Sequence, residues 1–102
     1  QPISLVNAKV GRQLDELIKV VKVDAPKVPN SSIILDVGNN NAISKTQMID
    51  LMEEIKNQPK IVLVNTAVPR IWRDSNNKII KEVADFIEVL IKKFPNFYEI
   101  LN

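Results

Sequence analysis

Short apolar runs alternate along this chain with longer segments that have the apolar spacing of amphipathic helices. The runs lie at residues 3–6, 33–35, 61–64 and 97–101. Short runs without polar alternation, such as 33–35, are typical of strands covered on both faces, as in parallel sheets. Strands separated by helices in the order βαβαβαβ predict a doubly wound α/β fold, with a parallel sheet and helices on both faces.

Three segments between these runs place apolar residues three and four positions apart, as helices with one buried face do. The apolar faces are Leu14, Leu17, Ile18 and Val21 in the first segment, Met48, Leu51, Met52 and Ile55 in the second, and Ile80, Val83, Ala84, Ile87, Leu90 and Ile91 in the third. Ser44 and Gln47 have the spacing of a capping box, which predicts the start of the second helix. Asp74 or Ser75 is the expected N-cap of the third helix, and a proline follows each segment.

The composition restricts the chemistry that this chain can perform. Its 102 residues are 45% hydrophobic, which suits one domain or part of one, and contain neither His nor Cys. The commonest general base and thiolate metal ligands are therefore missing, and we expect no metal or cofactor. Fourteen scattered basic residues against 12 acidic ones do not indicate nucleic-acid binding. No apolar run approaches the ~18–20 residues of a membrane span, so we expect no direct membrane insertion of this segment.

Two polar clusters follow directly after predicted strands, at residues 36–41 and 65–72. The carboxyl ends of parallel strands meet at one edge of the sheet, where open α/β folds hold their sites. The three successive carboxamides at residues 39–41 could stabilise an oxyanion, although Gly and Asn also simply tolerate the left-handed backbone of a loop. Gly11, at a strand-to-helix junction, could likewise be a turn residue or direct its backbone amide at a ligand.

Other residues of these clusters have ordinary structural interpretations beside functional ones. Trp72 could be a packing residue and Arg70 a solvated or paired surface charge. Asp36 could act as a general base or simply accept hydrogen bonds from nearby amides. Because the chain has no His, no Ser–His arrangement can be assembled from it, and no Ser or Thr is a credible activated nucleophile.

Three ordered segments carry a resemblance to a known family. They are Val-Asn-Ala-Lys-Val-Gly-Arg-Gln at 6–13, Leu-Asp-Val-Gly-Asn-Asn at 35–40, and Val-Asn-Thr-Ala-Val-Pro-Arg-Ile-Trp at 64–72, followed by Asn77. In this order they resemble the SGNH (GDSL-like) hydrolase domain of peptidoglycan O-acetyltransferases, from about residue 6 to the last residue. The resemblance implies a three-layer α/β/α sandwich of flavodoxin-like type that lies outside the cell, behind a multi-span acyltransferase membrane domain.

The resemblance also implies roles for particular residues. The backbone amide of Gly11 and the side-chain amide of Asn40 would form an oxyanion hole, with Gly38 as the turn residue before Asn40. Four further residues match the signature after the next strand, and we expect them to shape the substrate site: Pro69, Arg70, Trp72 and Asn77.

The chain departs from the family pattern in two places. The nucleophile belongs to a Gly-Asp-Ser block upstream of residue 6 and the base to an Asp-x-x-His block downstream of residue 101, and neither block occurs here. Ser4 is no substitute, because neither Gly nor Asp precedes it. Residues 1–102 are thus expected to be a partial SGNH-like domain that is inactive alone. In the family, the nucleophile strand lies between the strands that match 3–6 and 33–37.

For the intact parent protein, the resemblance implies O-acetylation of cell-wall peptidoglycan. The parent would be tethered to the cell membrane, its membrane acyltransferase domain would deliver the acetyl group, and cell-wall glycan would accept it. Two alternatives stay open at this point. One is a non-catalytic SGNH-like module that binds glycan or a partner protein, and the other is an unrelated flavodoxin-like domain that cradles a phosphate at its strand ends.

Overall fold

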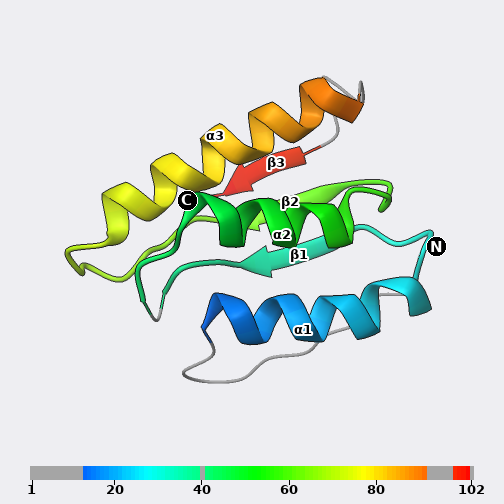
Figure 1. Cartoon of the computed structure of the whole chain (residues 1–102), viewed down its shortest axis with the longest axis horizontal. Helices are drawn as coiled ribbons and strands as arrows, with labels where there is room; N and C mark the ends of the chain where they lie inside the picture. The colour runs from blue at the N-terminus through cyan, green and yellow to red at the C-terminus, as the bar shows by residue number, and fades with distance from the viewer. Residues whose placement is uncertain (1–12, 40, 92–97, 102) are drawn as a thin grey trace.

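The computed structural model describes residues 13–39, 41–91 and 98–101. Its elements, in chain order, are α1 (Leu14–Asp24), the short 3-10 helix η1 (Ala25–Lys27), β1 (Ile33–Asp36), α2 (Lys45–Ile55), β2 (Ile61–Val64), α3 (Arg73–Ile91) and β3 (Tyr98–Leu101) (Figure 1). The predicted α/β class and the strands and helices expected within these ranges are confirmed. The strand expected at residues 3–6 lies outside the described residues.

The three described strands form one parallel sheet in the order β1-β2-β3. Ile33 of β1 lies opposite Ile61 of β2, which lies opposite Tyr98 of β3. The strands therefore follow one another across the sheet in the order of the sequence. The connection from β1 to β2 contains α2 and the connection from β2 to β3 contains α3, as in a βαβ unit. Within the described residues β1 pairs only with β2, so the strand order that the resemblance implies beyond β1 stays a prediction.

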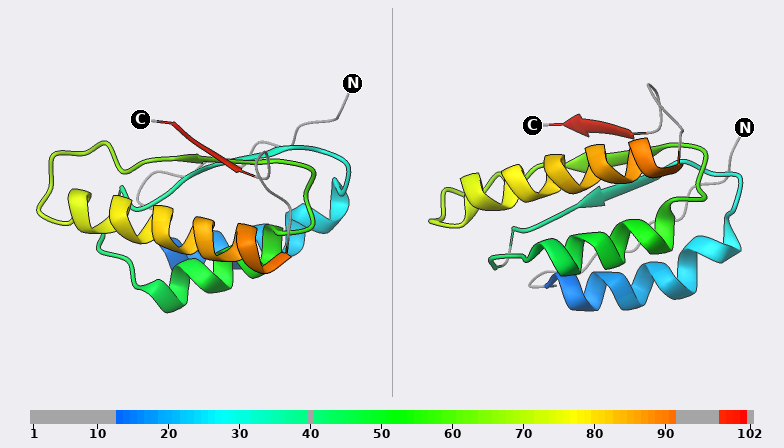
Figure 2. Two further views of the ribbon diagram at one scale, coloured as in Figure 1. Left: turned by 90° about the horizontal axis from the view of Figure 1, so that it is seen from above. Right: turned by 45° about the horizontal axis from the view of Figure 1, so that its top comes forward.

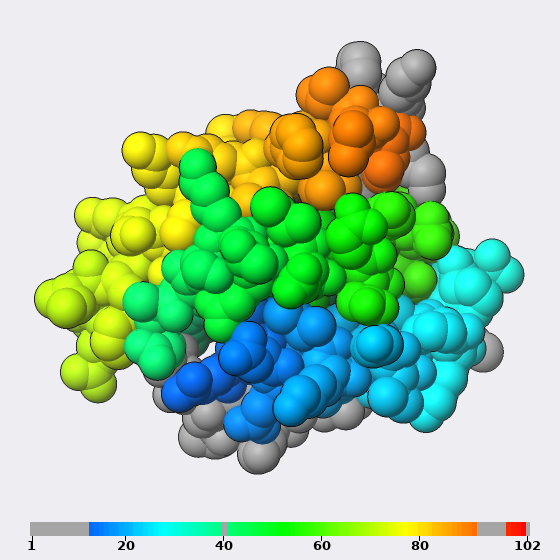
Figure 3. Space-filling view, viewed as in Figure 1, coloured from blue at the N-terminus to red at the C-terminus, as the bar shows by residue number. Residues whose placement is uncertain are grey.

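All three helices pack on one face of this sheet, with α2 between α1 and α3 (Figures 2 and 3). The side chains that fill the space between the helices and the sheet are Leu14, Leu17, Val21, Leu35, Met48, Leu51, Met52, Ile55, Ile61, Leu63, Ile80, Val83, Ala84 and Ile87. The buried faces of α1 and α2 are the predicted ones. That of α3 is as predicted at Ile80, Val83, Ala84 and Ile87, but the prediction is wrong at Leu90, which is 58% exposed because it lies off the inward face of the helix. Burial of the Val, Leu, Ile and Met side chains among them contributes about 1.5–3 kcal/mol each.

The other face of the sheet carries Ile34, Val62, Val64 and Leu101, because alternate residues of a strand point to opposite faces. Ile34 is 68% exposed and Leu101 43% exposed. Among the described residues, two of the three expected layers are present, one of helices and one sheet. This architecture agrees with a partial flavodoxin-like fold.

The start of α2 follows its sequence signal and the start of α3 does not. The Ser44 side chain accepts a hydrogen bond from the Gln47 amide at 3.1 Å, and the Gln47 side chain accepts one from the Ser44 amide at 2.8 Å. The predicted capping box is therefore confirmed. The expected N-cap at Asp74 or Ser75 is wrong, because α3 begins at Arg73 and the amide of residue 76 already bonds to the carbonyl of residue 72 at 2.9 Å. Asp74 instead lies in the first turn, where a carboxylate is favoured by the helix dipole.

Candidate functional site

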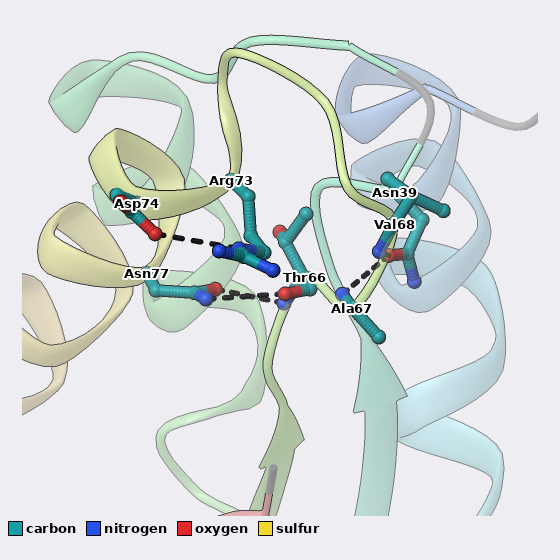
Figure 4. A network of polar contacts seen from close by, with 7 residues as sticks. All are labelled: Asn39, Thr66, Ala67, Val68, Arg73, Asp74 and Asn77. Atoms are coloured by element: carbon teal, nitrogen blue, oxygen red, sulfur yellow. Dashed lines mark hydrogen bonds and ion pairs between the residues drawn. The ribbon is translucent and has the colours of Figure 1, made fainter.

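The polar clusters that follow β1 and β2 lie side by side at the carboxyl edge of the sheet. The loop after β1 runs from residue 37 to 44, the loop after β2 runs from 65 to 72, and the beginning of α3 lies against both (Figure 4). Their proximity follows from the parallel pairing of the two strands, whose last residues, Asp36 and Val64, are partners. The sequence-based expectation of a shared position for the two clusters is met within the described residues.

Gly38 turns the chain at the end of β1 with a φ of +83°. L-residues rarely adopt this conformation, and glycine does so without steric cost. A Cβ at this position would also lie 2.7 Å from the Nδ2 atom of Asn76 and even closer to the hydroxyl of Thr66. A glycine is therefore needed at position 38 for two reasons: its positive φ, and the close approach of the Thr66 and Asn76 side chains.

Asn76 is a buried residue that sequence reasoning did not single out. Its Nδ2 donates to the carbonyls of Gly38 at 3.0 Å and Asn41 at 2.9 Å, and its Oδ1 accepts from the amide of Ile43 at 2.9 Å. The available signal was its spacing, because Asn76 lies four residues before Ile80 on the inward face of α3. A polar residue at an apolar position of a helix requires partners, and here they are backbone groups of the loop after β1.

Asn77 and Thr66 fasten the loop after β2 (Figure 4). The Asn77 carboxamide accepts from the Thr66 amide at 2.7 Å and donates to the Thr66 carbonyl at 3.1 Å. The Thr66 hydroxyl donates to the Val37 carbonyl at 2.7 Å, and this bond ties the two loops together. Asn77 thus acts on the backbone of the loop that carries the other signature residues.

Asn39 joins the same two loops from the opposite side. Its Oδ1 accepts from the amides of Ala67 at 2.9 Å and Val68 at 3.4 Å, and its Nδ2 donates to Asp36. Burial raises the pKa of the Asp36 carboxyl, and the Asn39 hydrogen bond partly opposes that effect. Of the two interpretations open for Asp36, the structure shows the hydrogen bond with a neighbouring amide.

The remaining predicted site residues divide between described and undescribed parts of the chain. Gly11 and Asn40, the expected oxyanion hole, lie outside the described residues. Pro69 and Arg70 are exposed in the loop after β2. Trp72 is half-buried just before α3, and its Nε1 is buried without a hydrogen-bond partner in the described part of the chain.

The described residues contain no cluster of three or more metal-ligating side chains. The same part of the chain has no helix whose length and apolar character would allow it to cross a membrane. The fold and the site define an α/β domain in which hydrogen bonds connect the polar loops that follow β1 and β2, at the carboxyl ends of parallel strands. That position is where open α/β sheets bind their ligands.

The chain is similar to bacterial O-acetyltransferases. It is 36% identical over 84 residues to the peptidoglycan O-acetyltransferase OatA of Listeria monocytogenes. It is 35% identical over 85 residues to a protein of Staphylococcus aureus (strain COL) provisionally named as an O-acetyltransferase. It is 29% identical over 80 residues to YrhL of Bacillus subtilis, provisionally named as a peptidoglycan O-acetyltransferase.

These matches cover most of this chain and a small part of each relative. They include 81% of this chain for the first two relatives and 78% for the third, but only 13%, 14% and 12% of the relatives' own lengths. No protein-family model matches the chain. A relationship to peptidoglycan O-acetyltransferases over a partial region is therefore established, and the activity of a whole protein is a matter for proposal.

Proposed function

We propose that this chain is the central part of an SGNH-type acyltransferase or esterase domain whose intact parent O-acetylates cell-wall peptidoglycan. The observation that carries the proposal is the set of hydrogen bonds by which Asn76 holds Gly38, Asn41 and Ile43 at the carboxyl edge of the sheet. A preorganised loop at this position is what an oxyanion donor requires, since catalysis by such donors depends on their being placed before the reaction.

The three carboxamides after Gly38 are not equivalent. Asn39 commits its carbonyl oxygen to two backbone amides and its amide group to Asp36. The Asn41 carbonyl oxygen accepts from the amide of Ala42 at 2.8 Å. An oxyanion donor uses its NH2 group, which in Asn39 is already bonded to Asp36. We assign the donor to Asn40 because that is the position that the resemblance indicates.

The reaction proceeds in two acyl-transfer steps. A Ser of the parent, outside this segment, attacks the carbonyl carbon of an acetyl donor and passes its proton to a His, also outside this segment. The oxyanion that forms receives hydrogen bonds from the Gly11 backbone amide and the Asn40 side chain, and the donor's leaving group departs with a proton. A sugar hydroxyl then attacks the acetyl-Ser, loses its proton to the His, and regenerates the Ser through a second oxyanion.

The placement of the domain and its partners belongs to the same proposal. The domain faces the cell wall outside the membrane, cell-wall glycan is the acceptor, and a membrane acyltransferase domain of the same parent supplies the acetyl group. Support comes from the names of the relatives, two of which refer to peptidoglycan. Pro69, Arg70 and Trp72 lie in the loop after β2, at the carboxyl edge of the sheet, and we assign to them the shaping of the substrate site.

The test uses the intact parent protein and an activated acetyl ester, with and without a peptidoglycan fragment as acceptor. Asn40→Ala should lower kcat by about 10²–10³-fold with little change in KM, because the donor acts mainly in the transition state. Asn57→Ala is the matched control, an exposed carboxamide between α2 and β2 at the opposite edge of the sheet. Its kcat should equal that of the unsubstituted protein.

Two results would contradict the proposal. A near-normal kcat with a raised KM in Asn40→Ala would make Asn40 a substrate-binding residue. An intact protein that binds glycan without turning over acetyl esters would favour the non-catalytic module.

A further inference from the structure

Asn76 has an unusual position for a polar side chain. It is fully buried, on the face of α3 that also carries Ile80 and Val83 in the core. A buried amide without partners costs about 1–3 kcal/mol, so such a residue persists only where its hydrogen bonds are made. Asn76 makes three of them, and all three go to the backbone of one loop.

The three bonds go to loop residues that precede and follow position 40 in the sequence. The Nδ2 atom binds the carbonyls of Gly38 and Asn41, which lie on either side of that residue along the chain. The Oδ1 atom holds the amide of Ile43, whose side chain is itself in the core. Two carbonyls three residues apart converge on one amide group, and this fixes the positions of Gly38 and Asn41 relative to α3.

The anchor for this loop is rigid because it belongs to the core of the domain. Asn76 lies in the first turns of a 19-residue helix whose inward face is buried. Gly38 has no side chain, and any Cβ there would approach Asn76 Nδ2 to 2.7 Å. Gly38 therefore leaves room for the side chain of Asn76. The position of the loop is set by α3 as well as by the local conformation of the turn.

We infer that Asn76 is a positioning residue for catalysis, whose buried carboxamide holds the loop after β1 so that the oxyanion donor is correctly placed. This inference rests on the proposed function. A displacement of about 1 Å from a productive geometry can lower a rate by roughly 10²-fold. Asn76→Ala should accordingly lower kcat by about 10–100-fold while KM changes by less than about twofold.

Gln58 provides a matched control for the structural effect of losing a buried carboxamide. It is 4% exposed, and its Nε2 donates to the carbonyls of Val28 at 2.9 Å and Ser31 at 3.0 Å. The chemistry is the same as at Asn76, an amide group that bridges two carbonyls of one loop. That loop precedes β1, so it lies at the opposite edge of the sheet from the proposed site.

The experiment compares Asn40→Ala, Asn76→Ala, Gln58→Ala and the double variant Asn40→Ala/Asn76→Ala in the intact parent protein. Rates are measured at a temperature where circular dichroism shows each variant folded. We expect Asn76→Ala and Gln58→Ala to lower the Tm alike, and only Asn76→Ala to lower kcat. The double variant should have the kcat of Asn40→Ala, because a residue that acts through Asn40 adds nothing once Asn40 is gone. If Asn76→Ala does not fold, Asn76→Ser replaces it in every comparison.

Each other outcome has a defined meaning. Equal kcat losses in Asn76→Ala and Gln58→Ala would show a general effect of destabilisation and overturn the inference. Fully additive losses in the double variant would do the same, since Asn76 would then act independently of Asn40. A low kcat in Asn40→Ala together with a normal kcat in Asn76→Ala would overturn the inference about Asn76 and leave the proposed function standing. A normal kcat in Asn40→Ala would overturn the proposed function, and the inference with it.

Discussion

The side chain of Asn77 pairs with both backbone groups of Thr66, accepting from its amide at 2.7 Å and donating to its carbonyl at 3.1 Å. This is the pattern that a neighbouring strand would supply, provided here by a carboxamide just beyond the end of β2. The amide and carbonyl of Thr66 thus have hydrogen-bond partners just beyond the end of the sheet, and the path of the loop after β2 is defined there. These two hydrogen bonds join the first turns of α3 directly to the start of the loop after β2.

Asn77→Ala should therefore destabilise the domain by about 1–3 kcal/mol, because it leaves a part-buried amide and carbonyl of Thr66 without their partners. The measurement is the free energy of unfolding of the intact domain in urea. Asn30→Ala, at an exposed turn position, should change the same quantity by less than about 0.5 kcal/mol. Equal values for the two variants would contradict the role given to Asn77.

Gly38→Ala should also destabilise the domain, by about 1–3 kcal/mol, because its φ of +83° is unfavourable for alanine and the added methyl group meets Thr66 and Asn76. The steric part can be separated with Thr66→Ala, which removes the nearer of the two obstacles. Gly38→Ala should cost less when introduced into Thr66→Ala than into the unsubstituted domain. Equal costs in both backgrounds would leave backbone strain as the whole effect.

The contact between β3 and α3 should make stability depend on pH. The Tyr98 hydroxyl donates to Asp85, and Lys81 Nζ lies 3.1 Å from the same carboxylate. The hydrogen bond from Tyr98 holds the pKa of Asp85 below its ordinary value of 3.8, with help from Lys81. Burial and the bond to Asp85 raise the pKa of Tyr98 above 10.0.

The signs of the two effects follow from linkage. A lowered carboxyl pKa stabilises the folded state above pH ~4 and ceases to do so as the pH falls through the folded pKa. A raised phenol pKa stabilises it below pH ~10 and ceases to do so as the pH rises through the folded pKa. The difference in unfolding free energy between the unsubstituted domain and Tyr98→Phe should therefore be largest near neutral pH and decrease toward both extremes. A difference that is constant from pH 3 to 11 would rule out this coupling.

The 102-residue segment alone should have no esterase activity, because it contains no His and no nucleophile block. Hydrolysis of an activated acetyl ester by the purified segment should equal that of its Ser4→Ala variant. Turnover well above that of Ser4→Ala would show that the chemistry had been assigned to the wrong residues.

Local order could be predicted from the amino-acid sequence. The strands of the described part, the buried faces of α1 and α2 and the Ser44–Gln47 capping box follow from spacing, since each depends on residues within a few positions of one another. The placing of two polar clusters at one edge also followed, because parallel strands end on the same side. The predicted N-cap of α3 was wrong, because the position of the first turn depends on the path of the loop that connects β2 to α3.

What holds the loops together was decided only by tertiary structure. Asn76 reaches carbonyls 35 and 38 positions away, Asn39 reaches amides 28 and 29 positions away, and Tyr98 meets Asp85 only where β3 passes α3. No local pattern specifies such partners. They exist because the parallel sheet brings distant segments to one edge, where buried polar groups must find hydrogen bonds and the nearest available ones belong to another loop.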